Sequence, residues 1–388
     1  MTDSFNRIKS LILQLKGLAT IGISDILGSV ITAVFWLYIA SILGAENYGN
    51  VSYFLAIGGI ASTVSLLGSQ TTLTVFTAKN VKIESTIYLI AIISGIVTCV
   101  ILFFMFQSLG LSTYAFGVII FGLVNGELLG KRLYKSYSKY ILVQKILMVG
   151  LAIGLYHIIG INGIIFGIGL SFFSYSFKIY RGFKDSKIDF GLLKSRAGFI
   201  INNYVLDLSS TLSGSLDKLI TGSLLGFVLL GNYQLGLQFL AILLILPNII
   251  YKYTLPNDAS GTSTRKKKNA AILTSAGITA LGVLLSPIII PPLFPKYTHV
   301  IEIIQILSFA LVPATITLLY NSKFLGNEKT RIVLYGAGVH LLILIIGIMI
   351  LGNYFSVKGV AIAYVLATSA HVVFYLVISK ANRNMNFN

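Results

Sequence analysis

Long apolar segments follow one another along the whole chain, and this feature restricts the fold more than any other. A helix needs about 20 apolar residues to cross a hydrocarbon core of about 30 Å. Short polar joints separate the segments, which lack the strict alternation of barrel strands. The chain is 56% hydrophobic and 11% charged, so we expect an all-α, polytopic membrane protein. Twelve transmembrane helices are predicted, over residues 18–43, 50–76, 86–107, 112–130, 140–158, 161–179, 198–225, 231–254, 270–291, 300–322, 332–352 and 357–379.

Lysine and arginine are concentrated in alternate joints, as they are when those joints face the cytoplasm. Lys296 and Lys358 lie in the opposite joints, Lys218 lies inside a span, and the other 26 of the 29 cations fall at the chain ends or in or close to the even-numbered joints, with Lys145 just inside the fifth span. The net charge of +17 is therefore interpreted as a topology signal. Nucleic acid is not an expected partner, and both termini are predicted to be cytoplasmic.

The same pattern divides the chain. Residues 1–17 form an expected amphipathic helix on the inner leaflet, because apolar and basic residues fall on opposite faces. Residues 18–180 and 198–380 are two predicted six-helix bundles. A basic cytoplasmic linker, 181–197, joins them, and a cytoplasmic tail, 381–388, follows.

An internal repeat relates the two bundles. Placing Asp25 on Asp207 also places Leu43-Gly44 on Leu225-Gly226 and Gly49-Asn50 on Gly231-Asn232, and puts Trp36 on Lys218. A second zone matches Asn125 with Asn321 and Gly163 with Gly359 after one change of offset. Because six spans are even in number, the halves enter the membrane in the same direction. The prediction is two parallel-repeat six-helix bundles around a central cavity.

Polar residues recur at steps of three and four along the seventh span, which places them on one face of a helix. The stripe includes Asn203, Asp207, Thr211, Asp217 and Lys218. A charge at the bilayer centre costs about 2.5–3.5 kcal/mol on the insertion scale, so the stripe is expected to face the protein interior or water. Three interpretations of Asp217 and Lys218 remain open: a structural ion pair, a contact to substrate or ion, and a lysine that snorkels to the interface.

Other polar residues complete the candidate site. Asp25, Asp207 and Glu127 are candidates for binding a coupling ion or proton, although Glu127 has an alternative partner in Lys131 one turn later. Gln70, Gln234 and Gln238 offer uncharged donors to a substrate. His340 and His371 are intramembrane but isolated in sequence, so packing roles are expected for them.

Several classes of function lack their signatures. The segment GELLGKR at 126–132 has the wrong spacing for a phosphate-binding loop, so ATP hydrolysis is not expected. The single cysteine, Cys99, allows neither an intrachain disulfide nor a cysteine metal cluster. The short joints leave no room for a catalytic domain outside the membrane. No cofactor, metal or catalytic residue is predicted, and the protein is not expected to be an enzyme.

Four segments resemble one family of transporters. They are DKLITGSLLGFVLLGNYQLGLQF at 217–239, ILGAENYGNVSYFLAIGG at 42–59, PPLFPKYTHVIEIIQIL at 291–307 and LGNEKTRIVLYGAGVHLLILIIG at 325–347. Together they resemble the polysaccharide-exporter and flippase branch of the multidrug/oligosaccharidyl-lipid/polysaccharide (MOP) superfamily. The resemblance covers nearly the whole chain in order. The chain lacks the intramembrane arginine cluster and the fourteen spans of lipid II flippases, which disfavours lipid II as the cargo.

The resemblance implies that the protein flips an undecaprenyl-pyrophosphate-linked oligosaccharide, such as an O-antigen repeat unit, from the cytoplasmic to the periplasmic leaflet of a bacterial inner membrane. In the family's cation-lined cavity, Lys218 is a candidate contact, with Lys79 and Lys252 at the cytoplasmic mouth. Trp36, the amides and the hydroxyls are candidate sugar contacts. The implied partners are membrane lipid, Na+ or H+, and a polysaccharide polymerase with its chain-length regulator. The alternatives are a drug/cation antiporter of the same superfamily and a membrane enzyme of envelope glycan assembly.

Overall fold

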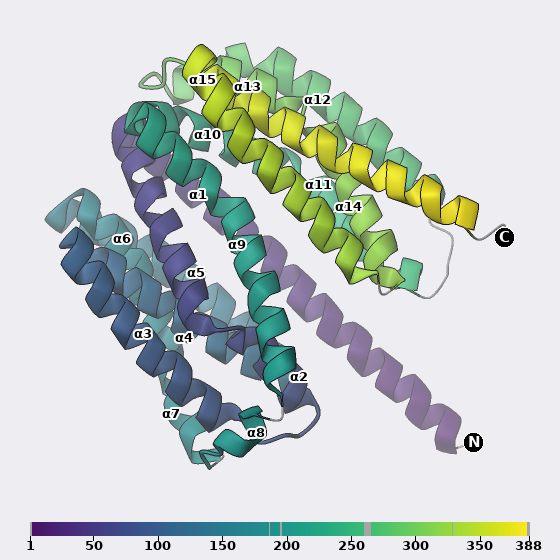
Figure 1. The fold of residues 1–388 in the computed structure, drawn as a ribbon. Coiled ribbons are helices and arrows are strands. Elements are labelled where there is room, and N and C mark those ends of the chain that lie inside the picture. The colour runs from purple at the N-terminus through teal and green to yellow at the C-terminus, as the bar shows by residue number, and fades with distance from the viewer. Residues whose placement is uncertain (1, 186, 195, 260–264, 328, 386–388) are drawn as a thin grey trace. The chain divides into compact units, whose positions relative to one another are not determined.

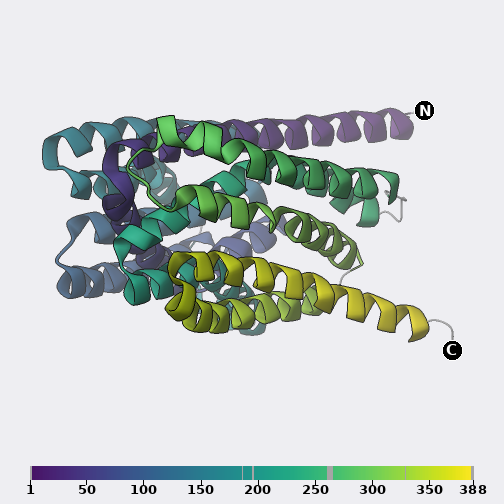
Figure 2. The ribbon, with the colours of Figure 1, turned by 90° about the horizontal axis from the view of Figure 1, so that it is seen from above.

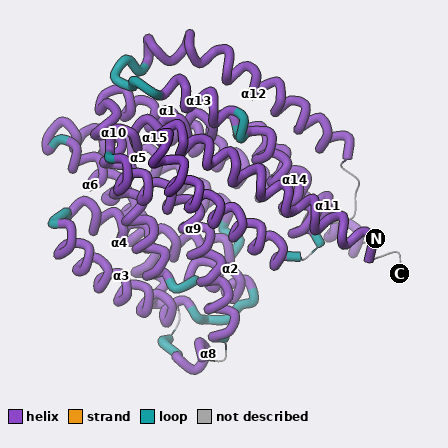
Figure 3. Tube along the Cα trace, turned by 45° about the horizontal axis from the view of Figure 1, so that its top comes forward, coloured by secondary structure: helices purple, strands orange, loops and turns teal. Residues whose placement is uncertain are grey.

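The computed structural model describes residues 2–185, 187–194, 196–259, 265–327 and 329–385. In these ranges the chain forms helices joined by short loops, and no strand occurs (Figure 3). The predicted all-α fold is confirmed.

The chain folds into two compact units that do not follow a single cut in the sequence. Unit 1 contains residues 1–35 and 57–211, and unit 2 contains residues 36–56 and 212–388. Two helices therefore contribute to both units: α1 (Thr2–Leu66) and α9 (Ala197–Leu225).

Unit 1 is built around α4 (Leu109–Gly130), whose neighbours include four of the helices of this unit. These are α2 (Ser69–Ala78), α3 (Glu84–Phe106), α5 (Tyr134–Ile159) and α6 (Ile161–Ser171); α3, α4 and α5 can be followed in Figure 1. The 3-10 turn η1 (Phe172–Tyr175), α7 (Ser176–Asp185) and α8 (Phe190–Lys194) lead to α9. Ile119, Leu123 and Tyr175 belong to the buried core of this unit.

Unit 2 contains the remaining helices. They are α10 (Phe227–Leu243), α11 (Ile245–Ala259), α12 (Arg265–Leu293), α13 (Val300–Ser308), α14 (Leu311–Gly326) and α15 (Thr330–Met385). Helix α14 packs on α11, α12 and α15, and the two halves of α15, yellow-green and yellow, lie side by side in Figure 2. The core of this unit includes Tyr233, Ile303 and Val360.

The outward faces of many helices remain apolar. Phe104 and Met105 on α3 are 70% and 68% exposed, and Leu284 and Ile288 on α12 are 68% and 70% exposed. Contiguous apolar faces of this kind are rare on soluble monomers but are expected where lipid covers a helix. The burial pattern therefore supports a multi-pass membrane protein.

The twelve predicted spans map onto these helices. In the described residues, seven helices are long and apolar enough to cross a membrane, or nine if each of two bent helix pairs counts as one span. Helix α1 contains the first predicted span and most of the second, which continues into α2, and α15 contains the last two; non-helical residues at Gly44 and Ser356 separate the spans within these helices. Helix α9 coincides with the seventh predicted span but carries Asp207, Asp217 and Lys218, which lowers its hydropathy.

The repeat is visible in matched glycines. Gly44 and Gly226 have the same left-handed φ, +74° and +85°, with ψ of 174° and 171°. A Cβ on Gly49 would overlap the carbonyl oxygen of Phe227, and a Cβ on Gly231 would overlap that of Ala45. These two contacts exchange under the repeat, because Ala45 corresponds to Phe227 as Gly49 corresponds to Gly231. Only glycine permits such a close crossing of helices.

Gly163 and Gly359 repeat the observation in the second zone. A Cβ at these positions would overlap the carbonyl oxygens of Leu155 and Leu351, respectively. The matched positions therefore share packing as well as residue type, as two homologous halves require.

Candidate functional site

A polar pocket of about 190 Å³ lies within unit 2. Its lining combines one ammonium group, one amide, one indole ring and two hydroxyls with two apolar side chains: Lys218, Gln234, Trp36, Ser52, Ser215, Leu55 and Ala56. The repeat-related positions Trp36 and Lys218 thus line the same pocket. Three of the predicted site residues, Trp36, Lys218 and Gln234, are brought together here.

Asp217 and Lys218 form an ion pair beside this pocket. The Nζ atom of Lys218 lies 3.3 Å from Oδ1 of Asp217 and also donates to the carbonyl oxygen of Gly214. Asp217 is 3% exposed, and its Oδ2 accepts a hydrogen bond of 3.1 Å from the hydroxyl of Tyr233. Both carboxylate oxygens are thereby satisfied, as a buried charge requires.

Lys218 retains capacity for a ligand. Its side chain is 18% exposed, and an ammonium group has three donors. Two of them have acceptors among the described residues, Asp217 and Gly214. The remaining donor belongs to a group that lines the pocket, so Lys218 combines an ion pair with access to a bound anion.

Gln234 supplies a second available group. Its Oε1 atom is buried and has no hydrogen-bond partner among the described residues. A buried acceptor without a partner costs about 1–3 kcal/mol. A donor from a ligand hydroxyl in the pocket would remove that cost. The Trp36 ring is held edge-on to Tyr48, with ring centroids 6.1 Å apart, and offers an aromatic face of the kind on which sugars stack.

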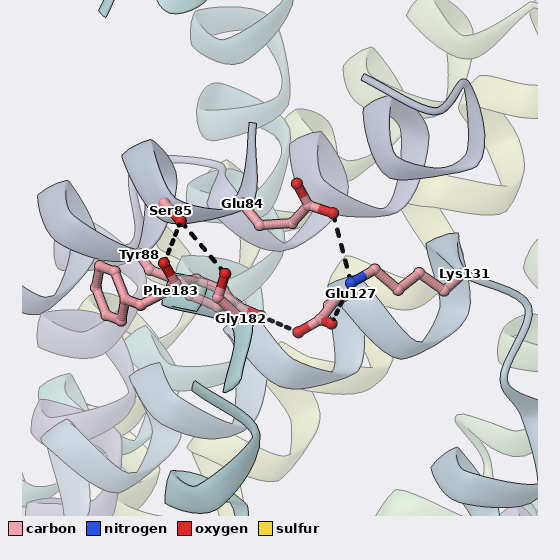
Figure 4. Close-up of polar contacts among 7 residues, drawn as sticks. All are labelled: Glu84, Ser85, Tyr88, Glu127, Lys131, Gly182 and Phe183. Atoms are coloured by element: carbon pink, nitrogen blue, oxygen red, sulfur yellow. Dashed lines mark hydrogen bonds and ion pairs between the residues drawn. The ribbon is translucent and has the colours of Figure 1, made fainter. Parts of the chain in front are cut away.

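A charged cluster in unit 1 contains Glu127 (Figure 4). Lys131 Nζ lies 2.7 Å from Oε1 of Glu127 and 3.6 Å from Oε1 of Glu84, so one ammonium faces two carboxylates on α3 and α4. The hydroxyl of Tyr88 donates to Oε2 of Glu127. Glu84 and Glu127 are 5% and 3% exposed. The predicted contact between Glu127 and Lys131 is confirmed.

The same cluster ties α3 to α7. Ser85, next to Glu84, donates to the carbonyl oxygens of Gly182 and Phe183 at 3.3 and 3.4 Å. A Cβ on Gly182 would overlap the ring of Tyr88, so the small residue lets the ring pass toward Glu127. The arrangement holds three helices together around a net negative group of side chains.

Several other predicted site residues belong to unit 1. Asp25 interacts with the hydroxyl of Tyr137 through a hydrogen bond. Thr211 shares a 3.0 Å hydrogen bond with Thr63, and Asn203 donates to Phe199 of its own helix. Asp207 is partly buried on α9.

Gln70 packs near Gly122 on α4, and Lys79, at the end of α2, lies over the Phe76 ring. Gln238 lies one turn after Gln234 on α10 of unit 2. The side chain of Lys252 lies outside the part of the chain that the structure describes. For these residues the predicted substrate and ion roles stay predictions.

Sequence reasoning missed three contacts. Tyr233 and Glu84 reach Asp217 and Lys131 from neighbouring helices, and no periodicity within one helix indicates such contacts. His340 and His371, expected to be isolated, lie with ring centroids 6.0 Å apart between the two halves of α15. Because the two histidines are far apart in the sequence, no sequence pattern indicates this contact.

Comparison with known proteins gives the fold a context. A family model described as "Polysaccharide biosynthesis protein" matches residues 14–131. The structure is similar to that of the lipid II flippase MurJ in an inward closed conformation, with a TM-score of 0.75 and 14% identity over 93% of this chain and 87% of that chain. No protein with a curated description matches the chain.

Two other transporters of the MOP superfamily have similar structures. An inward-facing multidrug resistance MATE family transporter has a TM-score of 0.66 and 16% identity, over 92% of this chain and 94% of that chain. A transporter from Pyrococcus furiosus, reported with a binding pocket of reversed polarity, has a TM-score of 0.66 and 14% identity over 95% of both chains. The resemblance inferred from the sequence is confirmed by the family model and the fold: the chain is a multi-pass membrane protein with the fold of MOP-superfamily flippases and transporters.

Proposed function

We propose that the protein is a flippase for an undecaprenyl-pyrophosphate-linked oligosaccharide, an O-antigen or similar surface polysaccharide repeat unit. It moves the cargo from the cytoplasmic to the periplasmic leaflet of a bacterial inner membrane by alternating access coupled to Na+ or H+. The observation that carries the proposal is the unit 2 pocket, where Lys218 stands beside Gln234 and Trp36. A cation, an amide and an aromatic face are the groups that bind phosphate and sugar.

The physical task matches this chemistry. A pyrophosphate and several sugars cannot enter hydrocarbon without losing their hydration, whereas a prenyl tail can stay in lipid. The protein therefore has to shelter only the head group. An ammonium held by Asp217 in a partly buried pocket offsets part of the lost hydration of a phosphate, because charge-assisted hydrogen bonds strengthen where water is scarce.

The comparisons support a lipid-linked cargo in two ways. The matched family model is described as a polysaccharide biosynthesis protein, and one structurally similar protein is a lipid II flippase. The identity of 14% means that its cargo does not transfer to this chain. A surface glycan, not lipid II, remains the cargo that we propose.

The remaining residues receive roles within the same proposal. Gln70, Asn203, Thr211 and Gln238 bind sugar hydroxyls during the cycle, while Lys79 and Lys252 attract the diphosphate at the cytoplasmic mouth. Asp25, Asp207 and Glu127 bind the coupling ion or proton. A polymerase and a chain-length regulator consume the flipped product on the far side.

A drug/cation antiporter is the second candidate. Structures of MATE transporters have TM-scores of 0.66 and 0.67 with this chain, and the net negative cluster of Glu84, Glu127 and Lys131 is a favourable environment for a cation. The pocket of unit 2 argues the other way, because its charged lining residue is a lysine.

Reconstitution separates the two candidates. Purified protein in proteoliposomes should transfer a defined undecaprenyl-pyrophosphate-linked oligosaccharide between leaflets, measured by its accessibility to an added glycan-modifying enzyme. The same vesicles should not accumulate a fluorescent organic cation under an imposed ion gradient. Cation uptake without glycan transfer would replace the proposal by the antiporter.

Two variants test the pocket in cells. Lys218→Ala should reduce glycan export by more than the accompanying fall in protein level explains, because it removes the anion contact and also leaves the buried Asp217 carboxylate with Tyr233 as its remaining partner. Asp217→Ala should reduce both export and protein level, because it leaves a partly buried ammonium without its counter-ion. Equal loss of folded protein in both variants would assign the pair a structural role only.

A further inference from the structure

Unit 1 contains a second pocket, of about 280 Å³, and its lining is mostly apolar. It lies between α2, α3, α8 and α9, and Ile87 and Ile90 of α3 form part of its wall. The polar groups in the lining are the hydroxyls of Ser69 and Thr72 and the ammonium group of Lys194. No step of the proposed transport cycle uses this pocket.

The pocket lies beside a break between α1 and α2. Gly68, at the break, has a left-handed φ of +72°, and a Cβ there would lie 2.8 Å from the carbonyl oxygen of Ile200 on α9. Glycine therefore lets α9 cross the break at close range. The pocket lining next to this crossing includes small side chains, Ser69 and Thr72 on α2 and Ala197 on α9, which leave the space open.

Three cations gather beside this pocket, where α2 ends and α9 begins. Lys194 lines the pocket itself. The guanidinium of Arg196 lies 5.0 Å from the centroid of the Phe76 ring, and the Nζ atom of Lys79 lies 5.9 Å from the same centroid. The Phe76 ring is also edge-on to that of Phe199 on α9, with centroids 5.1 Å apart. These contacts place the cations next to the first turns of α9.

The carboxylates of the neighbouring segments are engaged elsewhere. Oδ1 of Asp189 accepts a backbone N–H of α8 at 2.8 Å, and Glu84 at the start of α3 pairs with Lys131. Lys79 and Lys194 have no ion-pair partner among the described side chains. The edge of the pocket is therefore positively charged.

An apolar pocket with a cationic edge matches the two parts of an anionic lipid. A hydrocarbon chain fills apolar space, and a phosphate accepts charge-assisted hydrogen bonds from lysine and arginine. Basic pockets between transmembrane helices are known to bind anionic head groups. The cations here lie at helix ends, beside the polar joints where head groups meet a membrane protein, and not in the middle of a span.

We infer that unit 1 binds one anionic phospholipid, with part of an acyl chain in the pocket and its phosphate on Lys194 and Arg196. A volume of about 280 Å³ takes part of one hydrocarbon chain. Phospholipid is present at the membrane surface at all times, whereas a transported lipid has to leave after each cycle. The bound lipid connects α2 and α3 to α8 and α9. The inference goes beyond the proposed function and does not depend on the cargo.

Native mass spectrometry of the full-length protein in detergent tests the head-group contacts. Phosphatidylglycerol is titrated into delipidated protein, and phosphatidylcholine with the same acyl chains serves as the lipid without net charge. The first phosphatidylglycerol should bind more tightly than phosphatidylcholine. Lys194→Gln should weaken it about 5-fold, and Lys194→Gln with Arg196→Gln about 30-fold. Lys135→Gln with Lys139→Gln makes the same change in charge at two exposed lysines of α5 and should leave the affinity unchanged.

A change of volume tests the acyl-chain contact separately. Ala197→Leu places a larger apolar side chain in the pocket without changing the charge. It should weaken phosphatidylglycerol binding about 4-fold for each CH₂ group of the lipid that it displaces. Gly198→Ala, on the same turn of α9, adds a Cβ that meets open space and should bind the lipid as the wild type does.

The outcomes decide between the site, its occupant and the cargo. Equal affinities of the wild type and Lys194→Gln for phosphatidylglycerol, or equal affinities of the wild type for the two phospholipids, would overturn the site. Lys194→Gln leaves Arg196 on the Phe76 ring, so it decides if the double variant does not fold. Displacement of phosphatidylglycerol by an equal concentration of undecaprenyl pyrophosphate would assign the pocket to the cargo lipid and overturn the inference. Loss of glycan transfer with this lipid site intact would refute the proposed function alone.

Discussion

Removing the ammonium group of Lys131 should strongly destabilise unit 1. Its Nζ atom faces Glu127 at 2.7 Å and Glu84 at 3.6 Å. Coulomb's law at an effective dielectric constant of about 20 gives attractions of about 6 and 5 kcal/mol at these distances, before hydration is considered. In Lys131→Met the free-energy cost of removing the ammonium group from water no longer applies, but two buried carboxylates are left without a cation.

The loss of stability in Lys131→Met is limited, because a carboxylate left without its cation can take up a proton. Protonating a glutamate with an ordinary pKa at pH 7 costs about 4 kcal/mol of free energy. This value agrees with the loss of about 3–5 kcal/mol that follows from breaking a buried ion pair. At pH 5 the same protonation costs only about 1 kcal/mol, so the variant should lose much less stability at pH 5 than at pH 7.

Cys99 offers a reporter for this measurement. It is the sole cysteine and it lies on α3 of the same unit, where its thiol contacts the carbonyl oxygen of Ser112 on α4 at 3.3 Å. A thiol-reactive dye will report the separation of α3 from α4 during heating in detergent. At about 2–4 °C per kcal/mol, Lys131→Met should lower the midpoint by about 6–20 °C at pH 7.

Two further variants serve as a control and as a rescue. Lys135→Met changes an exposed lysine on the adjacent helix and should alter stability by less than about 0.5 kcal/mol. Adding Glu84→Gln and Glu127→Gln to Lys131→Met should restore most of the lost stability, because no uncompensated charge remains. The reasoning is refuted if Lys131→Met melts like Lys135→Met, or if the triple variant melts no higher than the single one.

Three further predictions concern other contacts. Gly231→Ala should lower the melting temperature and the yield of folded protein, because its Cβ would overlap Ala45, whereas Gly214→Ala, with open space around the glycine, should not. Tyr233→Phe removes the hydrogen bond to Asp217, and the loss should be about 1.5–3 kcal/mol, the range for a hydrogen bond to a charged group. Calorimetry should then show a changed affinity of the Asp217–Lys218 site for pyrophosphate. In a Cys99→Ala background, Lys187→Cys should react with an impermeant thiol reagent only from the cytoplasmic side; labelling from the outside of intact cells would contradict the predicted orientation.

The sequence predicts the helices well because hydrophobic length is a local property. Each predicted span coincides with a helix, half of a long helix, or an interrupted one. The interruptions themselves are less visible. The break at Leu67 and Gly68 and the 3-10 turn at Phe172–Tyr175 occur inside predicted spans, where side chains stay apolar while the backbone bends.

The site is only partly readable from the sequence. The pairs Asp217–Lys218 and Glu127–Lys131 could be found because their members are adjacent or one helical turn apart. The repeat also related Trp36 to Lys218. Tyr233, Glu84 and the two histidines belong to other helices or to the opposite half of a broken helix, and their contacts depend on tertiary packing.

The central claim is that Lys218 binds the diphosphate of a lipid-linked cargo, and Trp36 allows a direct test. It is the sole tryptophan and lines the same pocket as Lys218, so its emission reports on the pocket alone. Titration of the reconstituted protein with undecaprenyl pyrophosphate should give a saturable change in Trp36 emission. Loss of a charge-assisted contact of about 1.5–3 kcal/mol should make binding to Lys218→Ala about 10- to 150-fold weaker, while undecaprenol, which lacks the diphosphate, should give no saturable change with either protein. Equal affinity of the wild type and Lys218→Ala for undecaprenyl pyrophosphate would contradict the account.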